Sequence, residues 1–190
     1  MLTCLALVWL LVTAVHGQEP RRGGRLTIAT QQDPITMLGA VSPHLHTHMI
    51  TDTMFNGLVR QTWGDARYYP DLAERWEIAP DGKTYRFHLV RNATWHDGKP
   101  FTSADVKFSI EEVTLKNHPA GRTIFGALDR VETPDLYTVV LVMKQPDAPL
   151  MSYLASKAYV TIVPKHLYEG TDIKTNPHNF KPIGTGPFKF

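Results

Sequence analysis

Three histidines at alternate positions, His44, His46 and His48, form the cluster with the clearest chemical potential in the sequence. In a helix, His44 and His48 would lie one turn apart on the same face, which suits two metal ligands, whereas His46 would point away. Leu45 stands where the helix of a zinc hydrolase carries a glutamate beside its first histidine. Because two imidazoles without a third ligand make a weak site, His44 and His48 are weak candidates and we expect no bound metal.

No arrangement typical of a catalytic site stands out in the sequence. The histidine and aspartate within Trp95–Gly98 are adjacent, but neighbouring residues on a turn rarely face one reacting atom, so we interpret this stretch as turn scaffold. Ser103 and Ser109 have no base at a diagnostic spacing. Gly184–Pro187 lacks the Lys-Ser/Thr pair that ends a phosphate-binding loop. The sequence therefore predicts a protein that is not an enzyme and needs no cofactor, with a secreted hydrolase as the alternative from another functional class.

The N-terminus has the pattern of a secretory signal peptide. Met1–Val15 is an uncharged apolar run, and charged residues follow from Glu19 onward. We expect residues 1–17 to be the signal peptide, with cleavage after Gly17, although no basic residue precedes the apolar run. A transmembrane anchor is the alternative, but the run is shorter than the roughly 18 to 20 apolar residues that span a bilayer.

Composition excludes several classes of protein. The single cysteine, Cys4, lies within the leader, so we expect the mature chain to have no disulfide and no thiol nucleophile. The 20 basic and 18 acidic residues give a net charge of +2 without a block of like charges, which argues against a nucleic-acid partner. With 43% hydrophobic residues in 190, the chain can build a globular core.

The first part of the mature chain is expected to contain one strand and one helix. Arg25–Thr30 alternates apolar and polar residues and predicts a strand, which the polar stretch Gln31–Pro34 ends. Ser42 and Pro43 suit the N-cap and first position of a helix. Apolar residues at helical spacing predict that this helix continues to about Asn56.

A hairpin and a capped helix follow. Pro80-Asp81-Gly82 has the residues of a tight turn, so Trp76–Ala79 and Lys83–Val90 are predicted to pair as strands. Thr102 and Asp105 match a capping box, with aspartate in place of the usual glutamate. The helix they begin carries an apolar stripe, formed by Val106, Ile110 and Val113.

The remaining elements complete a mixed α/β pattern. Strands are predicted on either side of Pro134-Asp135, and a short helix and a helical turn are predicted further on. In chain order these elements are the strands Val131–Glu132 and Thr138–Met143, the helix Pro146–Ala155, the buried strand Tyr159–Val163 and the helical turn Pro164–Tyr168.

The stretch Trp76–Val113 resembles the signature region of the family-5 extracytoplasmic solute-binding proteins, the peptide, oligopeptide and nickel receptors of ABC importers. Four further stretches are similar to successive landmarks of that family: Phe55–Val59, Pro70–Ala73, Pro164–Leu167 and Pro182–Phe188. The resemblance covers residues 24–190. Several independent motifs in the same order make it specific.

The resemblance implies an α/β fold of the periplasmic-binding-protein type, type II, in the larger peptide-receptor subclass. It implies that residues 24–60 and 150–190 belong to the first lobe and that residues 61–149 form a peripheral subdomain. Members of the family are far longer. The chain is therefore expected to resemble the N-terminal part of such a receptor, without the second lobe.

The resemblance also implies a function in import. The protein is expected to be a periplasmic or otherwise extracytoplasmic monomer that captures peptides or similar solutes and delivers them to an ABC permease in the membrane. Extended peptides are held through main-chain groups and charged termini, which favours polar loops as ligand sites. The expected ligand-binding residues are Thr30, Gln31, Gln32, Asp33, His44, His46, Arg122 and Phe125.

Two alternatives stay open within this resemblance. A nickel or metal-chelate receptor of the same fold would use His44, His46 or His48. A truncated product without activity is the other alternative, because one lobe alone cannot enclose a ligand.

Overall fold

The computed structural model describes residues 23–25, 27–42, 44–62 and 64–190. The predicted signal peptide, residues 1–17, lies outside the described residues. Within the described part of the chain, none of the helices is both long enough and apolar enough to cross a membrane.

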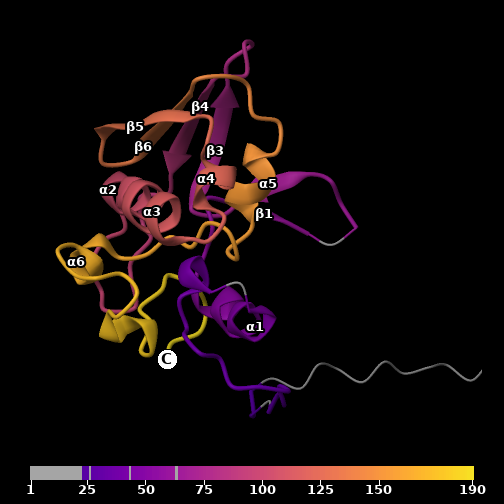
Figure 1. Cartoon of the computed structure of the whole chain (residues 1–190), viewed down its shortest axis with the longest axis vertical. Coiled ribbons are helices and arrows are strands. Elements are labelled where there is room, and N and C mark those ends of the chain that lie inside the picture. Colours follow the sequence, from indigo (N-terminus) through magenta and orange to yellow (C-terminus); the bar gives the residue numbers. More distant parts are fainter. Residues whose placement is uncertain (1–22, 26, 43, 63) are drawn as a thin grey trace, which may run out of the picture.

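An antiparallel four-stranded sheet, in the order β3-β4-β6-β5, forms the upper part of the molecule in Figure 1. Its strands are β3 (Ala73–Ile78), β4 (Thr84–Leu89), β5 (Leu128–Asp135) and β6 (Thr138–Met143). The predicted hairpin is confirmed: Ile78 pairs with Tyr85, and Gly82 supplies the positive φ of +67° in the turn. The predicted turn at Pro134-Asp135 is displaced, because both residues belong to β5.

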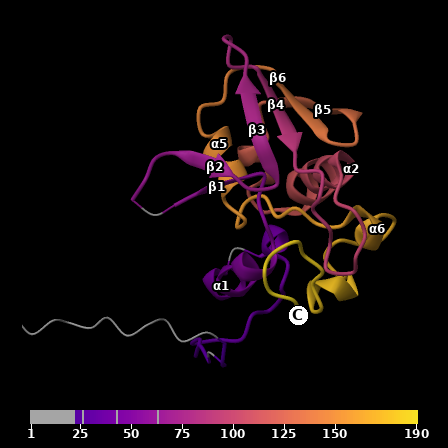
Figure 2. The same cartoon turned by 180° about the vertical axis from the view of Figure 1, so that it is seen from behind.

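One face of the sheet is covered by a helical rod. It consists of α2 (Ser103–Phe108), a π-helical segment η2 (Ser109–Thr114) and α3 (Leu115–Asn117). The two opposite views in Figures 1 and 2 place this rod on one side of β5 and β6. The predicted capping box is present, since the Thr102 N–H donates to Asp105 Oδ2 at 2.9 Å. Val106, Ile110 and Val113 are completely buried, as the apolar stripe predicted.

A second group of short elements extends below the sheet. The hairpin β1 (Val59–Gln61) with β2 (Tyr68–Pro70) projects from the side, and α5 (Leu150–Ala155) packs against β1. Below these lie η1 (Gly39–Val41) and α1 (Leu45–Met54), with the C-terminal segment beside α1 (Figure 1). The other short helices are α4 (Gly121–Ile124), α6 (Lys165–Tyr168) and η3 (Pro177–Asn179). The predicted helical turn at Pro164–Tyr168 corresponds to α6.

The hydrophobic core has two clusters. The larger lies between the sheet and the helices around it and includes Phe87, Trp95 and Leu141. The smaller joins the α1 region to the helical rod, with Phe55, Phe108 and Tyr168 among its members. The rod therefore contributes to both clusters and holds the upper and lower parts of the molecule together.

Two predicted strands are not observed. Residues 27–30 are exposed and have no backbone pairing with other described residues, and Tyr159–Val163 is not a strand although Val160–Val163 is buried. A strand requires a neighbour that accepts and donates its backbone hydrogen bonds. Neither segment pairs with a strand of either sheet in the described part of the chain, and the Tyr159 and Val160 N–H groups instead donate to the Ser156 carbonyl.

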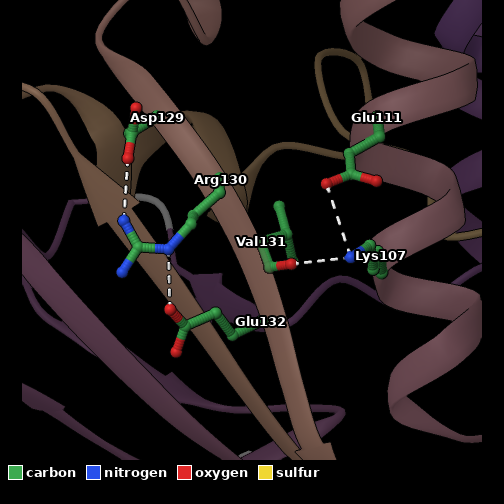
Figure 3. A network of polar contacts seen from close by, with 6 residues as sticks. All are labelled: Lys107, Glu111, Asp129, Arg130, Val131 and Glu132. Carbon is green, nitrogen blue, oxygen red and sulfur yellow. Dashed lines mark hydrogen bonds and ion pairs between the residues drawn. The ribbon is translucent and has the colours of Figure 1, made fainter.

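Charged side chains line the edge strand β5 of the sheet. The edge strand β5 carries Arg130 between two carboxylates, with Nη1 at 2.8 Å from Asp129 and Nε at 2.7 Å from Glu132 (Figure 3). From α2, Lys107 donates to the Val131 carbonyl at 2.9 Å. Charge on an edge discourages another chain from adding a strand.

Candidate ligand-binding surface

The predicted polar segment Thr30–Asp33 lies exposed just ahead of α1 in the chain. Within it, the Thr30 hydroxyl donates to the Gln32 carbonyl at 3.1 Å, which holds the segment in a bend. A few residues on, the chain becomes anchored, because Met37 N–H donates to the Asn179 carbonyl at 2.6 Å. The side chains of residues 30–33 are therefore exposed to solvent, and the chain that follows them is fixed at Met37.

The N-terminus of α1 is hydrogen-bonded to the stretch of chain that follows this polar segment. The Thr47 hydroxyl donates to the Thr36 carbonyl at 3.0 Å, and the Ser42 hydroxyl lies 3.4 Å from that of Thr47. These contacts bring the start of α1 next to the end of the polar segment. Two of the predicted groups, residues 30–33 and His44 with His46, therefore lie within a few residues of Thr36 and Thr47, which the first of these hydrogen bonds joins.

The helix begins later than its residues suggested. His44 is the N-cap and α1 starts at Leu45, whereas Ser42 and Pro43 were predicted as its cap and first residue. The Ser42 hydroxyl is buried and accepts the His44 N–H at 3.3 Å. Because Ser42 is engaged by this local turn, the helix begins after it. His44 consequently stands before the helix and not within it.

The three histidines of the cluster do not converge. His44 is exposed, His46 is half-buried and His48 is 9% exposed. Among the residues that the structure describes, no group of three or more histidine, cysteine, aspartate or glutamate residues is arranged to hold a metal ion.

His48 lies on α1 and His118 directly follows α3, and both side chains are largely buried. Burial lowers the pKa of each imidazole from the usual 6.5, and the proximity of His48 adds to this effect on His118. His118 Nδ1 accepts the Ala120 N–H at 2.9 Å, and its Nε2 lies 3.2 Å from the Ala158 carbonyl. The His118 ring therefore joins the turn after α3 to the loop after α5, and neither imidazole is displayed to a ligand.

Arg122 and Phe125 lie elsewhere. Arg122 is exposed on α4, which sits beside α5 and above α1 in Figure 1. Phe125 is 2% exposed and belongs to the larger core cluster. A side chain buried to that extent is occupied by packing, so we do not include Phe125 in the ligand site proposed below.

The His96 side chain is hydrogen-bonded to Gly184 and Gly186, which are far from it in the sequence, and we call this set of contacts the His96 latch. The His96 Nε2–H donates to the Gly186 carbonyl at 2.8 Å, and its Nδ1 accepts the Gly184 N–H at 3.2 Å. The backbone repeats the connection, since His96 N–H donates to the Gly184 carbonyl at 2.9 Å. The sequence indicated a turn at Trp95–Gly98, but it carried no sign that this turn meets Gly184–Gly186.

The segment Gly184–Phe188, which we call the C-terminal crossing, also contacts the end of α1. Gly186 N–H donates to the Met54 carbonyl at 2.8 Å. The Thr185 hydroxyl donates to Asn56 Oδ1 at 3.0 Å, and Asn56 in turn donates to Asp71 at 2.6 Å. Burial raises the pKa of the Asp71 carboxyl, although its hydrogen bonds act in the opposite direction. The crossing therefore sets the position of α1, which carries part of the candidate surface.

A family model matches residues 67–190, and its description is bacterial extracellular solute-binding proteins, family 5 Middle. A putative ABC transporter peptide-binding protein of Brucella ovis is 40% identical over 128 residues, which is 63% of this chain and 23% of that protein. The dipeptide-binding protein of Escherichia coli is 31% identical over 156 residues, which is 72% of this chain and 29% of that protein. The chain thus spans about a quarter of the length of these relatives.

Among solved structures, NikZ of Campylobacter jejuni in complex with Ni(L-His) is similar, with a TM-score of 0.72 and 30% identity. The match covers 84% of this chain and 31% of that protein.

Proposed function

The chain belongs to the family 5 bacterial extracellular solute-binding proteins, and on that premise we propose that it serves as the substrate-binding component of an ABC importer, capturing peptides or similar solutes outside the cytoplasmic membrane. The observation that carries the proposal is the likeness over 128 and 156 residues to two proteins named for peptide and dipeptide binding.

The proposed partners are a peptide or small solute and an ABC permease in the membrane, and the proposed role involves no catalysis and no nucleic acid. We propose a monomer that acts outside the cytoplasmic membrane, with the signal peptide cleaved near Gly17. We also propose that residues 24–60 and 150–190 belong to the first lobe and that residues 61–149 form a peripheral subdomain.

We propose that the ligand contacts the surface formed by Thr30–Asp33 and by His44 and His46. The chain after Thr30–Asp33 is fixed by the Met37–Asn179 hydrogen bond, and Thr36 is hydrogen-bonded to Thr47 next to His46. Most of these ligand-site residues are exposed. Polar side chains on a fixed support can reach the main-chain groups and termini of an extended peptide. Arg122 would contribute only where a ligand extends to α4.

Gene deletion and uptake measurements test the proposal on the protein as it exists. Removing the gene in its host should lower the uptake of labelled di- and tripeptides, and the gene on a plasmid should restore it. The protein purified as the host makes it should bind a peptide pool in a calorimeter. Normal uptake in the deletion strain, together with no heat from the pool, would contradict peptide import.

A nickel or metal-chelate receptor is the second candidate, favoured by the likeness to the Ni(L-His) complex and by the histidines at positions 44, 46 and 48. Replacing His44 and His48 with glutamine separates the two functions. Peptide affinity should change by no more than a few-fold in the double variant, because glutamine at the exposed position 44 can still hydrogen-bond a ligand and His48 is buried. Stoichiometric nickel binding that is lost in the variant and at acid pH would establish the second candidate.

A further inference from the structure

A pocket of about 250 Å³ opens between the helical rod and the loop that follows α6. It shares no residue with the proposed ligand surface. Residues 108–117 form one wall and residues 168–173 the other. Its volume lies below the roughly 300 to 1,000 Å³ of pockets that hold drug-sized ligands, so its occupant would be a smaller molecule.

The rod is widened where it lines this pocket. The π-helical turn η2 contains Glu112, and α3 continues from it with Lys116 and Asn117. The Asn117 side-chain amide donates to the Glu112 carbonyl at 2.7 Å, which satisfies a backbone acceptor in the wide turn. Single π-helical turns are uncommon and occur frequently at functional sites.

The pocket has apolar walls and one polar group without a partner. Phe108, Tyr168 and Ile173 are 8%, 1% and 7% exposed and provide the apolar surface. Within the described chain, the Tyr168 hydroxyl has no hydrogen-bond partner, although the ring is almost completely buried. Burial raises the pKa of this phenol, so it remains protonated and can donate. The hydroxyl is not among the fully enclosed polar atoms that lack a partner in the described chain, so it can reach the pocket and donate to a ligand acceptor.

The charges at the rim restrict the ligand further. Lys116 and Glu112 neutralise each other, with Nζ at 2.6 Å from the carboxylate. Asp172 also lines the pocket, accepts the Lys174 N–H at 2.9 Å and has no ion-pair partner among the described residues. One carboxylate is therefore left to attract a cation.

We propose that this pocket binds a single amino acid with an apolar side chain, in its zwitterionic form. The carboxylate accepts from the Tyr168 hydroxyl, the ammonium group faces Asp172, and the side chain packs on Phe108 and Ile173. A simple amine would leave the hydroxyl without an acceptor, and a simple carboxylate would face Asp172 with like charge.

Titration of the isotope-labelled protein with L-leucine tests this site. We expect amide resonances of residues 112–117 and 168–173 to shift, with a dissociation constant on the order of 1 mM, as suits so small a ligand. Isoamylamine, which lacks the carboxylate, and isocaproate, which lacks the amine, should each bind roughly fivefold more weakly or worse. No shifts, equal binding of either analogue, or shifts confined to residues 30–46 would overturn the proposal.

A pair of tyrosine variants provides a second test of the pocket. Tyr168→Phe removes only the unpartnered hydroxyl, so the protein should remain folded while leucine affinity falls by roughly fivefold. Tyr159→Phe is the matched control, because Tyr159 is 41% exposed and does not line the pocket. Unchanged leucine binding by a folded Tyr168→Phe protein would also overturn the proposal. The analogue comparison uses the unmodified protein and decides the question even if this variant does not fold.

Discussion

The buried imidazoles of His48 and His118 should make stability depend on pH. Burial lowers the pKa of both below 6.5. Between the lowered values and 6.5, the unfolded chain therefore binds more protons than the folded chain, and stability falls as pH falls through that interval. Asp52 opposes the shift at His48 and His44 reinforces it. We expect the urea midpoint to be lower at about pH 5.5 than at about pH 7.5.

A double variant identifies the source of this effect. Replacing His48 and His118 with glutamine should remove most of the difference between the two pH values, since glutamine does not titrate there. His44→Gln is the control, because His44 is exposed and should leave the difference intact. A double variant with the full pH dependence would assign the effect to other residues.

His96 should matter for stability although it has no catalytic partner. The change His96→Phe keeps the ring but removes the bonds to the Gly184 N–H and the Gly186 carbonyl. Two half-buried backbone groups then lose their partners, and we expect a loss of about 1 to 3 kcal/mol in the free energy of unfolding. Chemical denaturation measures it, with His44→Phe as the exposed control. Equal stability of the two variants would show that the latch contributes nothing.

At the scale of elements, Asp105 is shared by two helices. Its Oδ2 completes the capping box of α2, and its Oδ1 accepts the Lys165 N–H at the start of α6 at 2.9 Å. Loss of a cap typically destabilises by about 0.5 to 2 kcal/mol. We expect Asp105→Ala to lie at or above the upper end of that range and Thr102→Ala at the lower end, because Thr102 serves only α2.

Urea unfolding of the two variants measures this difference. Asp105→Asn is the matched control, since it retains an acceptor oxygen and should recover part of the loss. If Thr102→Ala and Asp105→Ala proved equally destabilising, the contact with α6 would be energetically irrelevant. Peptide or nickel binding should be the same in all of these variants as in the unmodified protein, because the capping box lies outside the proposed ligand surface.

The local elements were predictable where their signals act over a few residues. The Pro80-Asp81-Gly82 turn and the Thr102 to Asp105 box were both confirmed. The π-helical turn η2 was not predicted, since its sequence carries the same apolar stripe as an ordinary helix. The hairpin of β1 and β2 was also missed, because each strand has only three residues and shows no clear alternation.

At the scale of the whole molecule, the C-terminal crossing should tolerate no side chain at Gly186. A Cβ there would lie 2.6 Å from the Met54 carbonyl carbon and 2.8 Å from the Thr53 oxygen. Gly186→Ala must therefore displace backbone, and we expect it to destabilise by about 2 kcal/mol or more, as overpacking does. Gly98→Ala is the control: its Cβ meets open space, so only its φ of +86° is unfavourable, at about 1 to 2 kcal/mol.

Thermal and urea unfolding of both alanine variants provide the comparison. A Gly186→Ala protein no less stable than Gly98→Ala would mean that the crossing moves freely against α1. Because the crossing positions α1, any loss of the proposed ligand binding should follow Gly186→Ala more than Gly98→Ala.

The sequence by itself determined the fold class, the family and most of the local elements. The α/β class and the likeness to type II periplasmic binding proteins are confirmed by the structure and its solved neighbours. These features are carried by turn residues, caps and apolar stripes, which act between residues close in the chain.

Only the tertiary structure decided how distant residues meet. It placed Phe125 in the core, buried His48 while leaving His44 exposed, and joined His96 to Gly184 across 88 positions of sequence. It also left Thr27–Thr30 and Tyr159–Val163 without strand partners. Exposure, pairing and long-range hydrogen bonds depend on which surfaces pack together, and a local pattern of residues carries no information about its partner.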